Sequence, residues 1–386
     1  MNHEKRIFAA ACAGSLLFGM VMLSLGTVNS FLIERLSLDA LTIGSLAALL
    51  PLGILAGSLV FGPAVDRYGY KPSFVVPLVV MAAGFELIAF GSWFALLQVA
   101  FFVIGLGGGV INGSTNALVA DISEGKRSAR LSLLGFFFGV GALGMPGLTA
   151  ALAGLVSYTT VIAGIGLVVL AVAGVFAALR FPAPKHPQGF PLRQAAALLR
   201  EAPLLMLSSV LFFQSAMESM VSNWTALYIQ ESTRSSVEAS LVALTVFAAS
   251  LTVARLVLGG LLRTVRSERV VMVCYGLAVA GALMLTVQVS WLTALIAVVL
   301  LGAGLAPMFP VVFSYIGGMY PQLTGTAFGI ALVIALTGNM GLNYLVGVLW
   351  HAAGIGAYPV TLAACAVLGI ALFRAGLLRV PASART

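Results

Sequence analysis

Two acidic residues lie inside apolar stretches that are long enough to cross a lipid bilayer, Glu86 and Glu218. A charged side chain at the centre of a membrane costs at least about 2.5–3.5 kcal/mol, so each acid needs a reason to be there. A carboxyl group in that setting can carry a proton, accept hydrogen bonds from a ligand, or bond to a neighbouring helix. We favour a proton-carrying or ligand-binding role for Glu218. For Glu86 we favour structural bonding, with proton coupling as the alternative.

Side chains that both donate and accept hydrogen bonds recur four residues apart in the same stretches, a spacing that puts them on one helix face. Amides of this kind suit a polyhydroxylated ligand. The pairs are Asn112 with Asn116, Gln214 with Glu218, and Asn339 with Asn343. Trp224 and Phe309 could offer flat apolar faces to a pyranose ring. For the whole set we favour a polar cavity over hydrogen bonds between helices, which contribute about 0.6 kcal/mol each.

The composition indicates that membrane helices position these groups. Of the 386 residues, 61% are hydrophobic and 8% are charged, whereas soluble domains are about a quarter charged. Because about 20 apolar residues cross a bilayer, the chain has room for about twelve spans. The fold class is therefore an all-α integral membrane protein, with spans at 7–32, 42–65, 73–91, 94–118, 131–152, 157–179, 203–230, 237–262, 269–288, 291–316, 324–349 and 355–375.

The longest polar stretch divides these spans into two sets of six. It contains Pro182, Pro184, Pro187 and Pro191, which favour an extended linker. We therefore predict an N-terminal six-helix bundle over 1–180, a cytoplasmic linker over 181–202 and a C-terminal six-helix bundle over 203–386. The first apolar segment is longer than a signal peptide and has no small-residue cleavage site, so we expect it to be retained as a span.

The basic residues lie almost entirely on one side of this arrangement. With the N-terminus inside, the opposite face receives only Arg35 and Arg234, and Arg255 falls within a span. By the positive-inside rule both termini are cytoplasmic, in a multi-pass protein of the cell membrane. This placement explains the net charge of +8 without a nucleic-acid partner. The inner face receives the other 17: Lys5, Arg6, Arg67, Lys71, Lys126, Arg127, Arg130, Arg180, Lys185, Arg193, Arg200, Arg263, Arg266, Arg269, Arg374, Arg379 and Arg385.

The sequence lacks the residue patterns for disulfide pairing, metal binding, ATP binding and enzyme catalysis. The three cysteines and three histidines are scattered, so neither a disulfide framework nor a metal site is expected. No phosphate-binding GxxxxGK[ST] loop occurs, which disfavours ATP-driven transport, and no cofactor is expected. The sequence contains no nucleophile–base constellation that would indicate an enzyme.

The connector after the second span reads Gly62-Pro-Ala-Val-Asp66-Arg67-Tyr-Gly69-Tyr-Lys71. It resembles the GxxxDRxGxxK signature of the major facilitator superfamily, with Tyr70 in place of a second basic residue. The length, the twelve spans and the central linker also fit this family. The resemblance implies a cytoplasmic gate of Gly62, Asp66, Arg67, Gly69, Lys71 and Asp121 that latches the outward-facing state.

Within that gate, Asp66 is placed to meet the N-terminus of a neighbouring helix, whose dipole favours an anion. Arg67 can pair with Asp121, which ends the fourth span. The alternative is that these are solvated loop charges. A second copy of the loop has decayed, with Arg263 opposite Asp66. Arg255, in the eighth span, either snorkels to the interface or forms a structural ion pair near the gate.

A narrower resemblance links four segments to the fucose–glucose/galactose branch of the superfamily, whose members move monosaccharides, often with a proton. It implies that the seventh span lines the cavity, which adds Asn223 beside Trp224 to the candidate ligands. The branch's usual proton carriers are acids of the first or fourth span. Here the first span has none and Asn112 stands at the position of the fourth-span acid, so the resemblance leaves the coupling open. The segments are Gly105–Asn112, Leu133–Pro146, Glu218–Trp224 and Gly302–Pro310.

These patterns together predict a secondary transporter that works by alternating access. The expected cargo is a small polar solute such as a monosaccharide, with proton symport through Glu218 or Glu86 as the coupling. Its other expected partner is the lipid bilayer, and we expect a monomer. The alternatives are a proton-coupled drug or metabolite exporter of the same superfamily and a facilitative uniporter. A polar cavity would favour the first, and an apolar aromatic cavity the exporter.

Overall fold

The structure is a computed structural model in which residues 3–36, 40–152, 155–186, 191–287 and 290–381 are described. Long helices dominate these ranges, because a chain in lipid must satisfy its backbone hydrogen bonds internally. Those before the linker are α1 (His3–Leu36), α2 (Ala40–Tyr68), α3 (Tyr70–Phe90), α4 (Phe94–Ile122), α5 (Arg127–Leu152) and α6 (Tyr158–Ala178).

The helices after Ala178 begin with a short one. They are α7 (Leu192–Leu198), α8 (Ala202–Thr233), α9 (Val237–Leu261), α10 (Ser267–Thr286), α11 (Trp291–Leu305), α12 (Met308–Met319), α13 (Thr324–Ala353) and α14 (Ala357–Leu377). Twelve stretches of the described residues are long and apolar enough to cross a membrane, and α11 and α12 together make one of them. The predicted all-α membrane fold is confirmed.

By packing, the chain forms two units. The first comprises residues 1–122, 137–193 and 322–329, and the second comprises 123–136, 194–321 and 330–386. The helices α5 and α13 therefore contribute residues to both units. The predicted division into two six-helix bundles stays a prediction.

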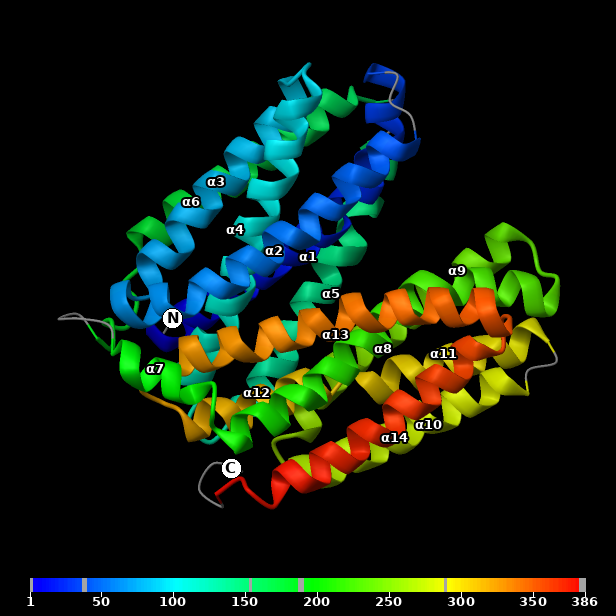
Figure 1. The fold of residues 1–386 in the computed structure, drawn as a ribbon. Coiled ribbons are helices and arrows are strands. Elements are labelled where there is room, and N and C mark those ends of the chain that lie inside the picture. Colours follow the sequence, from blue (N-terminus) through cyan, green and yellow to red (C-terminus); the bar gives the residue numbers. More distant parts are fainter. Residues whose placement is uncertain (1–2, 37–39, 153–154, 187–190, 288–289, 382–386) are drawn as a thin grey trace. The chain divides into compact units, whose positions relative to one another are not determined.

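In the first unit, α2 packs along α4, and α3 packs along both α4 and α6; Figure 1 shows α3 and α6 side by side. Glycines allow the close approach of α2 and α4. A Cβ atom on Gly57 would collide with the backbone of Leu106, and one on Gly109 with the backbone of Ile54. Such contacts explain these glycines, because helix association in lipid depends on small residues at the interface.

In the second unit, α11 packs against α9 and α10, while α8 contacts α9, α12 and α14. The small residues of the predicted tenth span serve this packing. A Cβ atom on Gly302 would lie 2.8 Å from the carbonyl oxygen of Phe247, and one on Gly304 would lie 2.6 Å from the amide nitrogen of Ala278.

Two segments differ from the sequence prediction. Residues 181–186 are not helical, as the prolines predict, but Leu192–Leu198 forms α7. All four prolines precede this helix, and its Leu, Arg, Gln and Ala residues favour helix. Pro187 lies outside the described residues. The predicted tenth span is interrupted at Ala306 and Pro307, because proline lacks the N–H group that would continue the helical ladder.

Candidate functional site

The carboxylate of Asp66, near the end of α2, lies at the N-terminus of α13. It accepts hydrogen bonds from the backbone N–H groups of Gly325 (3.2 Å) and Thr326 (2.9 Å) and from the Thr326 hydroxyl (2.6 Å). The first N–H groups of a helix have no partner within it, and the helix dipole favours a negative charge there. Asp66 is fully buried, so this cap is shielded from water.

Gly62 lies one turn before Asp66 and allows this approach. A Cβ atom at Gly62 would come 2.6 Å from the carbonyl oxygen of Gly325 and 2.8 Å from the Cα atom of Thr326. Both neighbours are backbone atoms, which cannot move aside as the end of a flexible side chain can. The glycine at this position therefore sets the distance between α2 and the start of α13.

We expect Gly62→Ala to lower both thermal stability and turnover, because the added methyl group must push α13 away from α2. Overpacking of this kind costs about 1–3 kcal/mol. The melting temperature in detergent and the transport rate in proteoliposomes measure the two effects. Gly276→Ala in α10 is the control, since among the described residues no neighbouring group lies within 4 Å of where its Cβ atom would stand. Equal behaviour of the two variants would contradict the role of Gly62.

Asp121 also has partners, but the predicted pairing with Arg67 is wrong. Asp121 pairs instead with Lys185 at 2.8 Å and accepts a hydrogen bond from the hydroxyl of Tyr70. The guanidinium of Arg67 lies 5.1 Å from the ring centroid of Tyr68, and the Arg67 side chain is exposed. Arg67 lies in the last turn of α2 and is exposed, so it is not held beside Asp121.

The first residues of the linker join this cluster. Lys185 donates a second hydrogen bond to the hydroxyl of Thr324 (2.9 Å), and the backbone N–H of His186 donates to the carbonyl oxygen of Asp66 (3.0 Å). No pattern in the sequence indicated Lys185 or Thr326. Tyr70 could have been found, because it occupies the motif position where a basic residue was expected.

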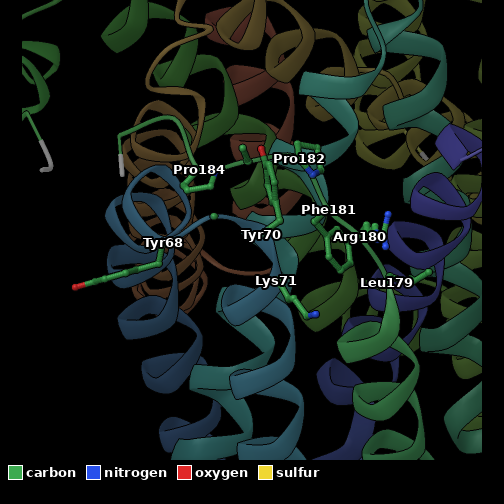
Figure 2. Close-up of a pocket in the computed structure, with 10 residues that line it drawn as sticks. Tyr68, Tyr70, Lys71, Leu179, Arg180, Phe181, Pro182 and Pro184 are labelled. Atoms are coloured by element: carbon green, nitrogen blue, oxygen red, sulfur yellow. The ribbon is translucent and has the colours of Figure 1, made fainter. Parts of the chain in front are cut away.

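The remaining predicted gate residues, Gly69 and Lys71, line a cavity of about 400 Å³ beside the turn between α2 and α3, shown in Figure 2. Gly69 has a φ of 82°, a left-handed conformation that favours glycine, and Lys71 is exposed. The cavity contains none of the predicted solute ligands. It is lined by residues 68–71 and by 179–184, the chain that leaves α6.

Glu218 lies near the middle of α8 and is held from two sides. Its Oε2 atom accepts hydrogen bonds from Nε2 of Gln214 (2.9 Å) and from Nη2 of Arg255 (3.2 Å). The side chain of Glu218 is 23% exposed, whereas that of Arg255 is 7% exposed. The carboxylate of the pair is therefore partly exposed, while its guanidinium is buried.

Arg255 is buried and forms an ion pair with Glu218, near the middle of α8, so it does not snorkel. Its Cβ points toward the start of α9 and so directs the side chain back along the helix. The start of α5 supports it: the Ser132 hydroxyl donates to the carbonyl oxygen of Arg255 (2.6 Å), and a Cβ on Gly135 would lie 2.8 Å from Cδ of Arg255. Sequence spacing could not have paired Glu218 with Arg255, because they lie on different helices.

Gln214 connects this pair to the interruption between α11 and α12. Its Nε2 atom also lies 3.4 Å from the carbonyl oxygen of Leu305, the last residue of α11. The buried Oε1 atom of Gln214 has no hydrogen-bond donor among the described residues. Phe309, in the first turn of α12, is half-buried with its ring edge-on to Phe313.

Four of the predicted solute ligands form a second polar cluster, between α8 and α13. Oδ1 of Asn343 accepts hydrogen bonds from Nδ2 of Asn223 (3.2 Å) and Nε1 of Trp224 (3.0 Å). Its Nδ2 donates to Ser219 and to the carbonyl oxygen of Asn339 (3.0 Å). Asn343 thus already uses both ends of its amide within the protein, and Asn223 is the exposed member.

Asn112 and Asn116 lie on α4, in the first unit, and are half-buried. Nδ2 of Asn116 donates to the backbone oxygen (2.8 Å) and to Oδ1 (3.1 Å) of Asn112. The pair therefore shares a helix face. Gln214, Glu218 and the α8–α13 cluster belong to the second unit.

Glu86 turns toward α6. A Cβ on Gly166 would lie 2.5 Å from Oε1 of Glu86, so the glycine makes room for the carboxyl group. That oxygen is buried and has no hydrogen-bond partner among the described residues. The helix contact explains how an acid fits at this position, while a role in proton coupling stays a prediction.

Twelve apolar stretches long enough to cross a membrane define a multi-pass membrane protein, and an ion pair joins two of them in the second unit. The profile of the Major Facilitator Superfamily matches residues 10–341, and the chain belongs to this family, which makes it a transporter and not an enzyme. The resemblance found in the sequence is thereby confirmed at the level of the family.

Two relatives match part of the chain. The myo-inositol transporter FST1 of Gibberella moniliformis is 27% identical over 136 residues, which are 35% of this chain and 24% of that protein. The organic anion transporter 3 of Sus scrofa is 33% identical over 101 residues, which are 26% of this chain and 19% of that protein. The matched stretches thus span at most about a quarter of these relatives.

Solved structures share the fold over nearly the whole chain. The E. coli fucose:proton symporter has a TM-score of 0.80 at 18% identity, covering 97% of this chain and 99% of that chain. The human organic anion transporter MFSD10 has a TM-score of 0.76 at 18% identity, covering 96% of this chain and 100% of that chain. A proton:xylose symporter has a TM-score of 0.74 at 14% identity, covering 97% of this chain and 95% of that chain. At such identities the likeness concerns the fold.

Proposed function

We propose that this transporter moves a monosaccharide or a closely related polyol together with a proton, by alternating access. The observation that carries the proposal is the group formed by Gln214, Glu218 and Arg255 inside membrane-spanning helices. It combines a partly exposed carboxylate with an amide oxygen that lacks a donor among the described residues. The carboxylate and the amide oxygen can both accept hydrogen bonds from hydroxyl groups of a solute.

Glu218 is the residue that we assign to the proton. An ionised carboxylate inside a membrane is stable beside a guanidinium, and it becomes neutral when it binds a proton. Glu218 can therefore exist in two charge states that differ in their contact with Arg255. The interruption of the tenth span next to Gln214 supports the assignment, because secondary transporters often place substrate sites at discontinuous helices.

Uptake of labelled monosaccharides into proteoliposomes, with and without an inward proton gradient, tests the proposal. We expect at least one sugar to accumulate only when the gradient is present. Accumulation that is unaffected by the gradient would remove the proton from the proposal, and the absence of any sugar uptake would remove the substrate class.

A proton-coupled exporter of organic anions is the second candidate. The relatives in sequence and the similar solved structures each include an organic anion transporter. A buried arginine within a span, such as Arg255, can bind an anion. The direction of transport separates the candidates. An exporter would reduce the accumulation of its substrate in intact cells, whereas a symporter would raise it.

We also propose that both termini lie in the cytoplasm of the cell that carries this protein in its membrane. Single-cysteine variants at Lys185 and Ser236 test this orientation, because an odd number of spans separates the two positions. An impermeant thiol reagent applied to intact cells should label the residue at 236 and leave that at 185 unlabelled. Labelling of both positions from outside would contradict the twelve-span topology.

A further inference from the structure

The cavity beside the turn between α2 and α3 is formed by two segments of the first unit. Residues 68–71, the turn itself, make one wall, and residues 179–184, which follow α6, make the other. Its volume of about 400 Å³ lies within the range of about 300–1,000 Å³ that is typical of ligand sites. Tyr68, Pro182 and Ala183 in these walls are exposed, so the cavity opens to the surroundings of the protein.

The cavity lies at the depth where the apolar spans end. Three membrane-crossing stretches have an end there: α2 ends at Tyr68, α3 begins at Tyr70, and α6 ends at Ala178. The phosphate groups of a bilayer lie at the ends of such spans, just outside the hydrocarbon core of about 30 Å. Tyr68 is 60% exposed, which fits this zone because tyrosine is enriched at the interface between lipid and water.

Each wall carries one cation, Lys71 from the turn and Arg180 from the chain after α6, and Figure 2 shows both. Both residues are exposed, and neither side chain forms an ion pair or a hydrogen bond with another described residue. The nearby acids Asp66 and Asp121 have other partners, at the start of α13 and at Lys185. The cavity therefore offers two positive charges to an anion.

An apolar surface continues from these cations along the exposed sides of α3 and α6, which pack side by side. Val76 and Val79 follow Lys71 on α3, and Val175 precedes Arg180 on α6; all three valines are exposed. They lie within membrane-crossing stretches, where an exposed side chain contacts the acyl chains of lipids. A ligand that carries both an anionic group and acyl chains therefore matches the two surfaces together.

We propose that this cavity binds the phosphate of an anionic phospholipid, with Lys71 and Arg180 as the cationic ligands and the acyl chains along α3 and α6. Basic pockets at the cytoplasmic ends of membrane helices bind anionic lipid headgroups, and arginine and lysine are the side chains that bind phosphate. The apolar surface favours a lipid over a water-soluble phosphate ester. The identity of the leaflet depends on the proposed orientation, whereas the site itself does not.

A lipid bound there contacts the start of the linker where it lies against the turn. The ring of Phe181 stacks on that of Phe74 at 5.3 Å between centroids, and a Cβ on Gly69 would lie 3.4 Å from the ring of Pro184. Because the cavity needs both walls, it exists only while the linker is in this position. A ligand that binds one arrangement raises its population, so the bound lipid stabilises the contact between linker and turn.

The experiment titrates the purified full-length protein in detergent with dioleoyl phosphatidylglycerol, and measures binding by native mass spectrometry and by the melting temperature. Dioleoyl phosphatidylcholine has the same chains without the net charge, and glycerophosphoglycerol has the same headgroup without the chains. We expect one phosphatidylglycerol to bind at least about tenfold more tightly than phosphatidylcholine and to raise the melting temperature. Glycerophosphoglycerol at the same concentration should leave the melting temperature unchanged.

Variants assign the binding to the two cations. Lys71→Gln and Arg180→Gln should each weaken phosphatidylglycerol binding about fivefold, and the double variant about 30-fold, as is typical for cations near an anionic lipid. The matched control Arg263→Gln/Arg266→Gln removes two exposed arginines from the connector between α9 and α10, and should bind as the wild type does. All four positions are exposed, so each variant is expected to fold, which a monodisperse elution profile checks.

Three results would overturn the inference. An equal loss in the two double variants would show that anionic lipids are attracted by basic residues in general and not by this cavity. Equally tight binding of phosphatidylcholine would show that the cations do not contribute. Equally tight binding of glycerophosphoglycerol would assign the cavity to a soluble phosphate ester. The sugar and the proton of the proposed function are tested separately, by solute uptake, and stand or fall without the lipid site.

Discussion

Replacing Glu218 with glutamine is expected to abolish accumulation driven by a pH gradient while preserving exchange of labelled for unlabelled solute. Glutamine keeps the shape and much of the hydrogen bonding of glutamate but cannot carry a proton. With one proton per cycle, a gradient of about one pH unit sustains about tenfold accumulation in the wild type. The variant should show none above the equilibrium level, with exchange at a rate near that of the wild type.

Glu231→Gln is the matched control, because Glu231 is an exposed acid on the same helix, near its C-terminal end. It should accumulate solute as the wild type does. Since Arg255 loses its acid partner in Glu218→Gln, a monodisperse elution profile must accompany the transport data. If exchange disappears together with binding in a folded variant, Glu218 is a solute ligand and not the proton carrier. Unchanged accumulation would exclude both roles.

Replacing Asp66 with asparagine is expected to slow transport while leaving solute affinity nearly unchanged. Asp66 contacts the first turn of α13 and no predicted solute ligand among the described residues. A hydrogen bond to a charged group contributes about 1.5–3 kcal/mol, so losing the charge should change the balance of conformers by about 10- to 150-fold. Turnover in proteoliposomes should fall accordingly, and the dissociation constant should change by less than about threefold.

Glu124→Gln is the control for Asp66→Asn, since Glu124 is an exposed acid in the turn after α4. The melting temperature should fall in Asp66→Asn and stay constant in the control. A variant of Asp66 with normal turnover and lost binding would show that the residue acts on the solute site and not on the contact with α13.

The sequence alone determines the number and approximate ends of the membrane helices. Each span is an apolar run of about 20 residues, and lipid leaves the backbone little choice besides helix. The interruption at Pro307 likewise depends on a local property, the missing N–H group of proline, although a continuous tenth span was expected. The helix α7 was missed because the prolines before it dominated the interpretation of the linker, while its own residues favour helix.

The contacts of the predicted gate residues were partly accessible to sequence reasoning. A short motif identified Gly62, Asp66 and Gly69, because each depends on a local property: a missing side chain, a charge near a helix end, or a left-handed turn. Which basic residue pairs with Asp121 depends on the tertiary structure, which places Lys185 beside it. Lys185 lies in the linker, 64 residues away in the sequence, whereas the Arg67 side chain is exposed.

The interior polar groups show most clearly what the sequence determines and what the tertiary structure determines. The sequence determines that Glu218 and Arg255 lie within spans, since apolar residues surround both. Only the tertiary structure joins them, because the contact requires α8 and α9 to pack with these two positions facing each other, supported by the start of α5. Helix periodicity relates residues three or four apart on one helix, and it carries no information about which faces of two helices meet.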